Sequence, residues 1–284
     1  MDDGKLKAFI RLIRLPYWLI EGLLCVLFMI TFQRGFYKPV LMSLAVLTVA
    51  FIGAGGAAIN DYFDRESDAI THPDRPIPSH QISPTNAVQF SALTYIAGLL
   101  VSFVINPLAF GIAALTTVLF ILYPRVFKRY LGFLSNLVMG FLGATIPLFA
   151  EAVVFQTISI ASLSFVGMIA GGAIGLNVLK DVLTLDGDLK IGYPTLAIKR
   201  GIRIAAVVGA LFLLFSVLAS PLPYLVGIVS IVYLIPVTVW GCIVVYSALS
   251  LLKNPNAQNV NKRIKMFTTS AVVYPIALIA NAVL

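Results

Sequence analysis

Five acidic side chains fall within one short segment of this chain, which has only 12 acidic residues among 284. They are Asp61, Asp64, Glu66, Asp68 and Asp74. If the segment is helical, Asn60, Asp64 and Asp68 share one face at i, i+4 and i+8, and Asp61 joins it. Like charges at this spacing repel, so a cation would stabilise them. Because Mg²⁺ prefers oxygen ligands and substrate phosphates, the pattern predicts a Mg²⁺ site; the alternative is a solvated acidic loop.

A second acidic segment, with Asp181, Asp186 and Asp188, follows about 120 residues after the first. Asp61, Asp64 and Asp68 of the first segment are spaced by three and then four residues. Asp181, Thr184 and Asp188 repeat this 3 + 4 spacing, with Thr184 in place of the middle Asp. Gly- and Ala-rich stretches precede both segments, and we interpret them as close helix packing. The repetition predicts two facing half-sites. We therefore expect one domain over the whole chain, 1–284, with two related halves, 1–150 and 151–284.

Basic residues accompany both acidic segments. Arg75 follows the first, and Lys180 and Lys190 flank the second. A metal bridges phosphate oxygens to carboxylates, while guanidinium and ammonium groups bind the remaining phosphate oxygens. Acidic segments combined with Arg and Lys therefore predict a diphosphate site.

These segments must be positioned by helices that lie in a membrane. The chain is 60% hydrophobic and 11% charged, with a mean hydropathy of +0.97, and so few charges cannot cover a water-soluble domain. We expect an all-α, multi-pass integral membrane protein with nine transmembrane helices, the first of which is retained rather than cleaved as a signal peptide. The predicted spans are 16–33, 39–59, 86–105, 107–123, 131–150, 157–179, 203–220, 223–250 and 265–284. Pro147 and Pro236 are expected to kink their spans.

The distribution of basic residues predicts the orientation. With a cytoplasmic N-terminus, all of the 20 basic residues except Arg34 and Lys38 fall on the cytoplasmic side, as the positive-inside rule requires. Both acidic segments then face the cytoplasm. We expect the protein to reside in the cell membrane. No block of five basic residues exists, so the net charge of +8 indicates contact with membrane lipids rather than nucleic acid. No pattern indicates the oligomeric state.

The run NDYFDRESD over 60–68, followed by RPIPS over 75–79, resembles the UbiA superfamily of intramembrane prenyltransferases. Its second signature, DxxDxxxD followed by KxG, is matched by Asp181, Asp188, Lys190 and Gly192. The resemblance implies nine helices around a central cavity and Asp64, Asp68, Asp181 and Asp188 as catalytic residues. It implies Mg²⁺ held by Asn60, Asp61, Asp64, Asp68, Asp181, Asp186 and Asp188, and diphosphate contacts from Arg75, Lys190, Tyr123 and Lys128. The departures are Thr184 in place of Asp, for which Asp186 or a water could compensate, and His80 in place of Gly.

The implied reaction transfers a prenyl group from its diphosphate to a lipid or aromatic acceptor. The wording of the motifs is most similar to members that transfer geranylgeranyl to geranylgeranylglyceryl phosphate in archaeal ether-lipid synthesis. Two alternatives stay open: quinone-pathway members that prenylate 4-hydroxybenzoate or a naphthoate, and, from another class, a membrane transporter. Glu21 lies within the first span, where an acid either serves function or pairs with a basic neighbour. His72 and His80 read as loop residues, and Cys25 and Cys242 as packing residues.

Overall fold

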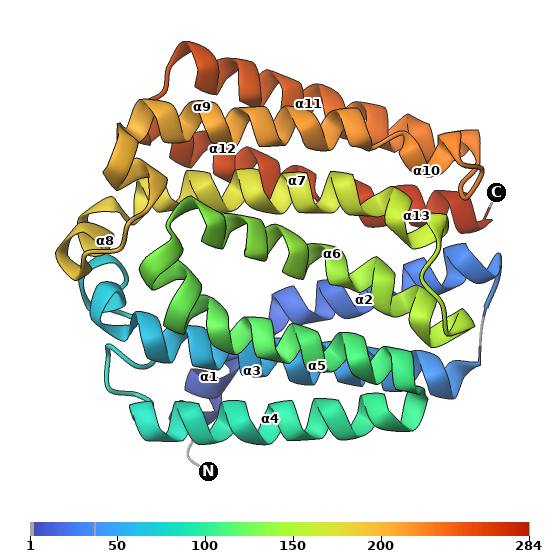
Figure 1. Cartoon of the computed structure of the whole chain (residues 1–284), viewed down its shortest axis with the longest axis horizontal. Helices are drawn as coiled ribbons and strands as arrows, with labels where there is room; N and C mark the ends of the chain where they lie inside the picture. Colours follow the sequence, from blue (N-terminus) through green and yellow to red (C-terminus); the bar gives the residue numbers. More distant parts are fainter. Residues whose placement is uncertain (1–2, 37, 284) are drawn as a thin grey trace.

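All the regular elements in the described part of the chain, residues 3–36 and 38–283 of a computed structural model, are helices. The longer helices lie side by side in a bundle (Figure 1), with α4 along one edge and α11 along the opposite edge. In chain order they are α1 (Asp3–Leu12), α2 (Leu15–Gln33), α3 (Pro39–Thr71), α4 (Pro84–Ile105), α5 (Pro107–Leu122), the π-helix η1 (Tyr123–Leu131), α6 (Phe133–Phe155), α7 (Ile160–Leu183), α8 (Leu185–Ile191), α9 (Leu196–Ala219), α10 (Leu222–Leu225), the 3₁₀ helix η2 (Ile231–Tyr233), α11 (Leu234–Lys253), α12 (Ala257–Ser270) and α13 (Val273–Val283).

The helices are long and apolar enough to confirm a multi-pass membrane protein. Eight helical segments of the described chain meet the length and hydropathy expected of a span, and a shorter apolar helix, Trp18–Gln33, lies in α2. This agrees with the predicted all-helical membrane fold. The count of nine and the cytoplasmic N-terminus stay predictions, since the bundle carries no membrane boundary.

Several helix ends follow from capping chemistry visible in the sequence. Asn106 ends α4 and caps α5, because its Oδ1 accepts from Ala109 N at 2.8 Å while Pro107 occupies the first turn. Ser83 caps α4 in the same way, with Oγ accepting from Asn86 N at 3.2 Å. An N-cap side chain satisfies one of the free amides of the first turn. The predicted break at 106–107 is therefore confirmed.

Several predicted spans differ from the observed helices. The span predicted at 39–59 continues in α3 to Thr71, and the one predicted at 203–220 begins earlier, at Leu196 of α9. The span predicted at 223–250 contains α10, an irregular turn and η2 before α11 begins at Leu234. Pro236 lies in the first turn of α11, where a missing amide costs nothing, so the prediction that it kinks a span is wrong. The span predicted at 131–150 continues to Phe155, and the one predicted at 265–284 corresponds to α12 and α13. Pro147 lies inside α6, which continues through it as one helix. The kink predicted at Pro147 stays a prediction.

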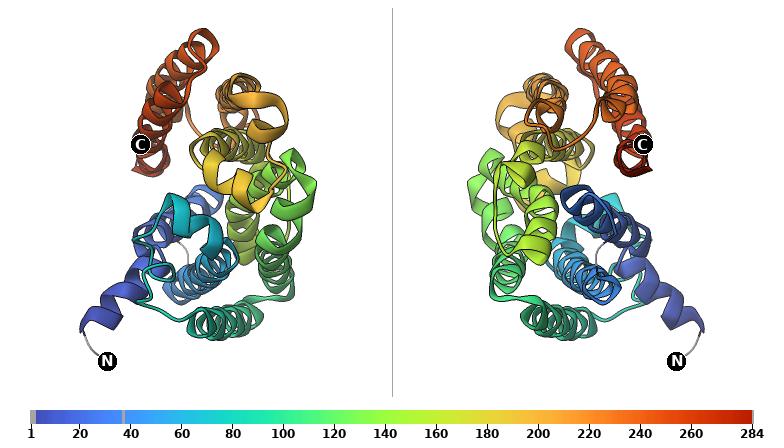
Figure 2. Two further views of the ribbon diagram at one scale, coloured as in Figure 1. Left: turned by 90° about the vertical axis from the view of Figure 1, so that its left-hand side faces the viewer. Right: turned by 90° about the vertical axis from the view of Figure 1, so that its right-hand side faces the viewer.

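Glycines let α3 approach its neighbours closely, as the Gly/Ala run predicts. A Cβ at Gly56 would lie 2.9 Å from the ring of Phe120 on α5, and a Cβ at Gly55 would lie 2.9 Å from Tyr95 on α4. A Cβ at Gly53 would collide with the indole of Trp18 on α2. α3 therefore packs closely against α2, α4 and α5, as the views along the bundle in Figure 2 show.

Candidate active site

The C-terminal part of α3 presents Asn60, Asp61, Asp64 and Asp68. Because α3 continues without a break to Thr71, the predicted i, i+4 and i+8 arrangement is present. The three Asp side chains are buried, with at most 6% of each residue exposed. Asn60 Nδ2 donates to Asp64 Oδ2 at 2.9 Å. A row of buried carboxylates requires compensating positive charge.

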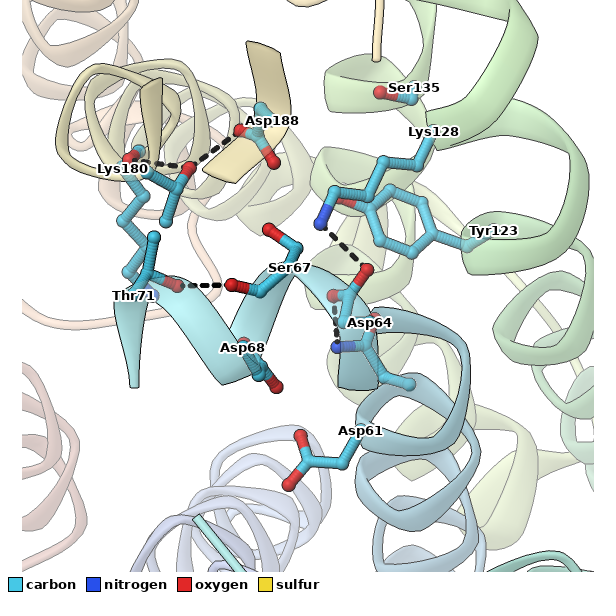
Figure 3. A network of polar contacts seen from close by, with 12 residues as sticks. Asp61, Asp64, Ser67, Asp68, Thr71, Tyr123, Lys128, Ser135, Lys180 and Asp188 are labelled. Carbon is cyan, nitrogen blue, oxygen red and sulfur yellow. Dashed lines mark hydrogen bonds and ion pairs between the residues drawn. The ribbon is translucent and has the colours of Figure 1, made fainter. Parts of the chain in front are cut away.

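Each of these buried carboxylates is hydrogen bonded by a different basic side chain. The three basic residues come from the α1–α2 junction, the π-helix and the loop after α3, so three elements converge on the end of α3; Figure 3 shows the pair of Lys128 with Asp64. The pairs are Arg14 Nη2 with Asp61 Oδ1 at 2.5 Å, Lys128 Nζ with Asp64 Oδ1 at 2.9 Å, and Arg75 Nη1 with Asp68 Oδ2 at 2.6 Å.

Arg75 lies between two of these carboxylates, since its Nη1 is also 3.6 Å from Asp61 Oδ1. Burial alone would lower the pKa of Arg75, but the charges of Asp61 and Asp68 outweigh burial and hold the pKa above its usual value. His72 Nδ1 lies 3.8 Å from Asp68 Oδ1. Burial, and then the charges of Arg75 and Arg14, lower the pKa of His72. The imidazole is therefore neutral at neutral pH, so Arg75 carries the positive charge of this loop.

The π-helix η1 explains how Tyr123 and Lys128 reach the same site. In a π-helix hydrogen bonds join residues five apart, so positions i and i+5 lie on the same face. Tyr123 OH accepts from Asn177 Nδ2 of α7 at 3.1 Å. Lys128 Nζ reaches Asp64 and lies 4.9 Å from the ring centroid of Tyr193. Figure 3 shows the Lys128 chain extending past the Tyr123 ring toward Asp64.

The second acidic segment bends between two helices. Asp181 is in the last turn of α7, Thr184 is the junction, and Asp188 is in α8. Asn136 Nδ2 donates to Asp181 Oδ2 at 3.1 Å, and Thr184 Oγ1 donates to Asp188 Oδ2 at 2.6 Å. The 3 + 4 spacing therefore yields a continuous helical face in α3 but a bent one here, because α7 ends at Leu183.

The two acidic segments meet at one end of the bundle (Figure 1). A Cβ at Gly187 of α8 would lie 2.7 Å from Ser67 Oγ and 2.8 Å from Thr71 Cγ2 of α3, so α8 packs directly on α3. Burial raises the pKa of Asp188; the charge of Lys128 opposes this shift, and the charge of Asp64 adds to it. The contact of α8 with α3 and the interaction of Asp64, Lys128 and Asp188 thus bring the two acidic segments together; that they form a single metal and diphosphate site stays a prediction.

The donors at this site fit Mg²⁺. Asp188 is fully buried, and its Oδ1 has no hydrogen-bond partner among the described residues. A buried carboxylate oxygen without a hydrogen bond favours a nearby cation, and carboxylates with an amide oxygen are suitable Mg²⁺ ligands. Within residues 3–36 and 38–283, no three His, Cys, Asp or Glu side chains converge as a ready metal cluster. In this structure Arg14, Lys128 and Arg75 hydrogen bond carboxylate oxygens of α3.

Two predicted site residues lie outside this network. Asp186 and Lys190 are exposed on α8, and neither hydrogen bonds or pairs with a described residue. Thr184 contributes its hydroxyl to Asp188, so it is part of the network in its own right. His80 lies in the loop after α3 with a positive φ of 59°, a conformation that suits the Gly implied by the resemblance.

Three residues of the network were not predicted. Arg14 was counted as a topology signal, and nothing in its spacing indicates that it reaches Asp61. Asn136 and Asn177 hold Asp181 and Tyr123. Both are polar residues within apolar runs, and that signal could have identified them, because polar side chains at membrane depth usually serve function.

An apolar cavity begins one helical turn below the polar site. Phe120, three residues before Tyr123, lines it together with side chains of α2, α3, α5 and α6, and it encloses about 440 Å³ of empty space including its open mouth. The resemblance implied a central cavity formed by all the helices, whereas this cavity is lined by helices of 1–150 only. Glu21 lines it and forms no hydrogen bond or ion pair with any described residue, so pairing with a basic neighbour is not observed.

Comparison with known proteins agrees with this site and fold. The chain is 30% identical over 282 residues to digeranylgeranylglyceryl phosphate synthase of Methanocaldococcus jannaschii, covering 98% of this chain and 97% of that protein. It is 36% identical over 201 residues to the enzyme of the same name from Natronomonas pharaonis, covering 71% of this chain and 72% of that protein.

Solved structures share the fold. A digeranylgeranylglyceryl phosphate synthase structure superposes with a TM-score of 0.79 at 29% identity, over 98% of this chain and 99% of that one. A UbiA homologue from Archaeoglobus fulgidus bound to GPP and Mg²⁺ superposes with a TM-score of 0.70 at 16% identity, over 98% of this chain and all of that one. The UbiA prenyltransferase family model matches residues 22–271. With the two acidic segments brought together above an apolar cavity, this match shows that the chain belongs to the UbiA prenyltransferase family.

Proposed function

We propose that this enzyme transfers a geranylgeranyl group from its diphosphate to the free hydroxyl of geranylgeranylglyceryl phosphate and releases diphosphate. The observation that carries the proposal is the position of the acidic and basic network directly above an apolar cavity. A prenyl diphosphate has a charged diphosphate head, which matches the acidic and basic network, and an apolar chain, which matches the cavity. The name shared by the relatives, at 30% identity over nearly the whole chain, supports this acceptor rather than an aromatic one.

The diphosphate would be bound by the basic groups that now hold carboxylates. Lys128 extends into the site from η1 and Arg75 from the loop after α3, and their charges match those of phosphate oxygens. Mg²⁺ would be held by Asp64, Asp68, Asp181, Asp188 and the Asn60 amide oxygen, and when bound it supplies Lewis-acid stabilisation of the leaving group. Asp61 is held by Arg14, and its place in this proposal is to fix Arg75. Lys190, exposed on α8, would attract the diphosphate at the outer edge of the site, and Asp186 would reach it only through a bound cation.

Transfer then breaks the bond between C1 of the donor and the diphosphate oxygen and forms an ether bond to the acceptor oxygen. Lys128 and Arg75 stabilise the charge that develops on the departing diphosphate, which is preorganised electrostatic catalysis. The Phe120 and Trp18 rings line the cavity below the polar site, where they would exclude water from the prenyl chain, and the Phe120 ring, nearer the polar site, would stabilise positive character on the allylic fragment. The acceptor hydroxyl gives its proton to the departing diphosphate.

The orientation of the protein is also part of the proposal. The distribution of Lys and Arg supports a cell-membrane protein with the α8 end of the bundle facing the cytoplasm, where the soluble diphosphate product is released. The single domain with two related halves, 1–150 and 151–284, stays a prediction.

One assay tests the reaction. Purified enzyme in detergent receives Mg²⁺ and radiolabelled geranylgeranyl diphosphate, with either geranylgeranylglyceryl phosphate or 4-hydroxybenzoate. We expect label in digeranylgeranylglyceryl phosphate, with diphosphate released in equal amount. Label in the benzoate product alone would move the protein to the quinone branch. No product and no diphosphate from either acceptor would end the assignment as a transferase of this class.

A further inference from the structure

Glu21 is an ionisable side chain in the wall of an otherwise apolar cavity. The wall also carries the hydroxyls of Thr48, Thr116 and Thr145, but each donates to a carbonyl of its own helix, at 2.9, 2.8 and 2.7 Å. Neither Lys nor Arg lines the cavity. A carboxyl group in such a place is costly unless it has a partner or water. Its presence therefore has a consequence for whatever enters the cavity.

The depth of Glu21 follows from the packing of α2 on α3. Trp18 packs on Gly53, and a Cβ at Gly22 would lie 3.2 Å from Val46. Because the two helices are antiparallel, Glu21 lies at the level of Thr48, which shares the cavity wall. The distance along α3 from Asp61 to Thr48 is about 20 Å at ~1.5 Å per residue.

That depth rules out a role in the chemical step. The allylic carbon that reacts is bonded directly to the diphosphate, so in this proposal it lies near Asp61 and Asp64, above the level of Gly56, on which Phe120 packs. A side chain about 20 Å from Asp61 along α3 reaches neither the breaking bond nor the acceptor oxygen. The donor chain, by contrast, has sixteen main-chain carbons and extends to about 19 Å as a zigzag of ~1.5 Å bonds. The end of the chain and the carboxyl group therefore meet.

We infer that Glu21 is a polar stop that selects a twenty-carbon donor by ending the apolar cavity. A donor with one more isoprene unit would press its terminal methyl groups against the carboxyl group and remove the water that hydrates it. A shorter donor would leave cavity wall uncovered and lose hydrophobic contact. This inference rests on the proposed function, because it takes the cavity to hold the prenyl chain.

Three variants test the stop with donor-chain length as the readout. Glu21→Ala removes the carboxyl group and opens the end of the cavity, whereas Glu21→Gln keeps its shape and polarity. Leu23→Ala is the matched control, since Leu23 lies on the same helix with 47% of its surface exposed. Each purified protein is tested with Mg²⁺ and twenty- or twenty-five-carbon prenyl diphosphate, by thermal stabilisation and by competition for transfer.

We expect Glu21→Ala to raise preference for the twenty-five-carbon donor about tenfold, a change of ~1.4 kcal/mol in relative binding. The Gln variant and the Leu23 control should keep the wild-type preference. An unchanged preference in Glu21→Ala would overturn the inference, as would loss of transfer in Glu21→Gln with a normal fold, which would give the carboxylate a chemical role. Failure of the wild type to use the twenty-carbon donor would instead reject the proposed function, and the thermal readout would still report whether Glu21 limits chain length.

Discussion

Lys128 offers the sharpest test of the site, because in the absence of substrate it occupies a carboxylate that a metal would bind. Its Nζ lies 2.9 Å from Asp64 Oδ1, and the two side chains are only 16% and 8% exposed. At an effective dielectric constant of ~20 the attraction is about 6 kcal/mol, and removing one partner of a buried pair costs about 3–5 kcal/mol. Lys128→Met removes the charge and keeps most of the apolar stem.

Without metal, we expect the Lys128→Met protein to melt roughly 5–10 °C lower than wild type. Mg²⁺ should restore more stability to the variant than to wild type, because Asp64 has lost a competing cation. Its Mg²⁺ affinity should rise at least about tenfold. Turnover should nevertheless fall about 10²–10³-fold, since the developing charge on diphosphate loses a donor.

Melting curves over a Mg²⁺ titration, together with the radiolabel transfer assay, measure all of these quantities. Arg129→Met is the matched control, because Arg129 is on the same π-helix but exposed, beside the ring of Tyr130. It should match wild type in each measurement. Weaker Mg²⁺ binding in Lys128→Met, or turnover at the wild-type rate, would refute the reasoning that Lys128 and the metal share Asp64.

Three further predictions address the carboxylates and the metal. Asp68→Ala should abolish transfer while the protein still inserts and purifies, whereas Glu66→Ala, whose side chain is 68% exposed, should retain activity; near-normal turnover of Asp68→Ala with added Mg²⁺ would defeat the two-segment site. Asn136→Ala removes the donor to Asp181 Oδ2 at 3.1 Å and should lower Mg²⁺ affinity about 10–100-fold in calorimetric titration, with Asn86→Ala at the start of α4 as control; an unchanged affinity would separate Asp181 from the metal. Chelation by EDTA should stop diphosphate release and excess Mg²⁺ should restore it, and release that continues in EDTA would contradict a metal-dependent step.

The face of α3 could be predicted from the sequence, whereas the groups that hold it could not. Spacing alone placed Asn60, Asp64 and Asp68 together because a helix has a fixed period. The positions of Arg14 and Lys128 depend on where other elements end. Arg14 adopts a left-handed conformation with φ 51° between α1 and α2, and Lys128 is turned inward by a π-helix. No local pattern encodes either of these.

The second segment shows the limit of motif comparison. The 3 + 4 spacing suggested a second straight face, but a shared spacing fixes geometry only within one helix. Here α7 ends at Leu183 and α8 begins at Leu185, so Asp181 and Asp188 belong to different helices. The packing of Gly187 on Ser67, a contact between residues remote in the sequence, is what returns Asp188 to the site.

The two acidic segments differ in which groups balance the charge of their carboxylates. This difference leads us to expect different roles for them in binding metal and diphosphate. Each Asp of α3 hydrogen bonds to a basic side chain, whereas Asp181 and Asp188 accept hydrogen bonds from the neutral groups Asn136 and Thr184. The carboxylates that no basic side chain hydrogen bonds therefore lie on the α7–α8 side, where Asp188 Oδ1 is buried without a hydrogen-bond partner among the described residues and the positive charge that acts on it from nearby is that of Lys128. We therefore propose that a free metal ion would be attracted first to that side. The carboxylates of α3 would become available to it once diphosphate draws Lys128 and Arg75 away.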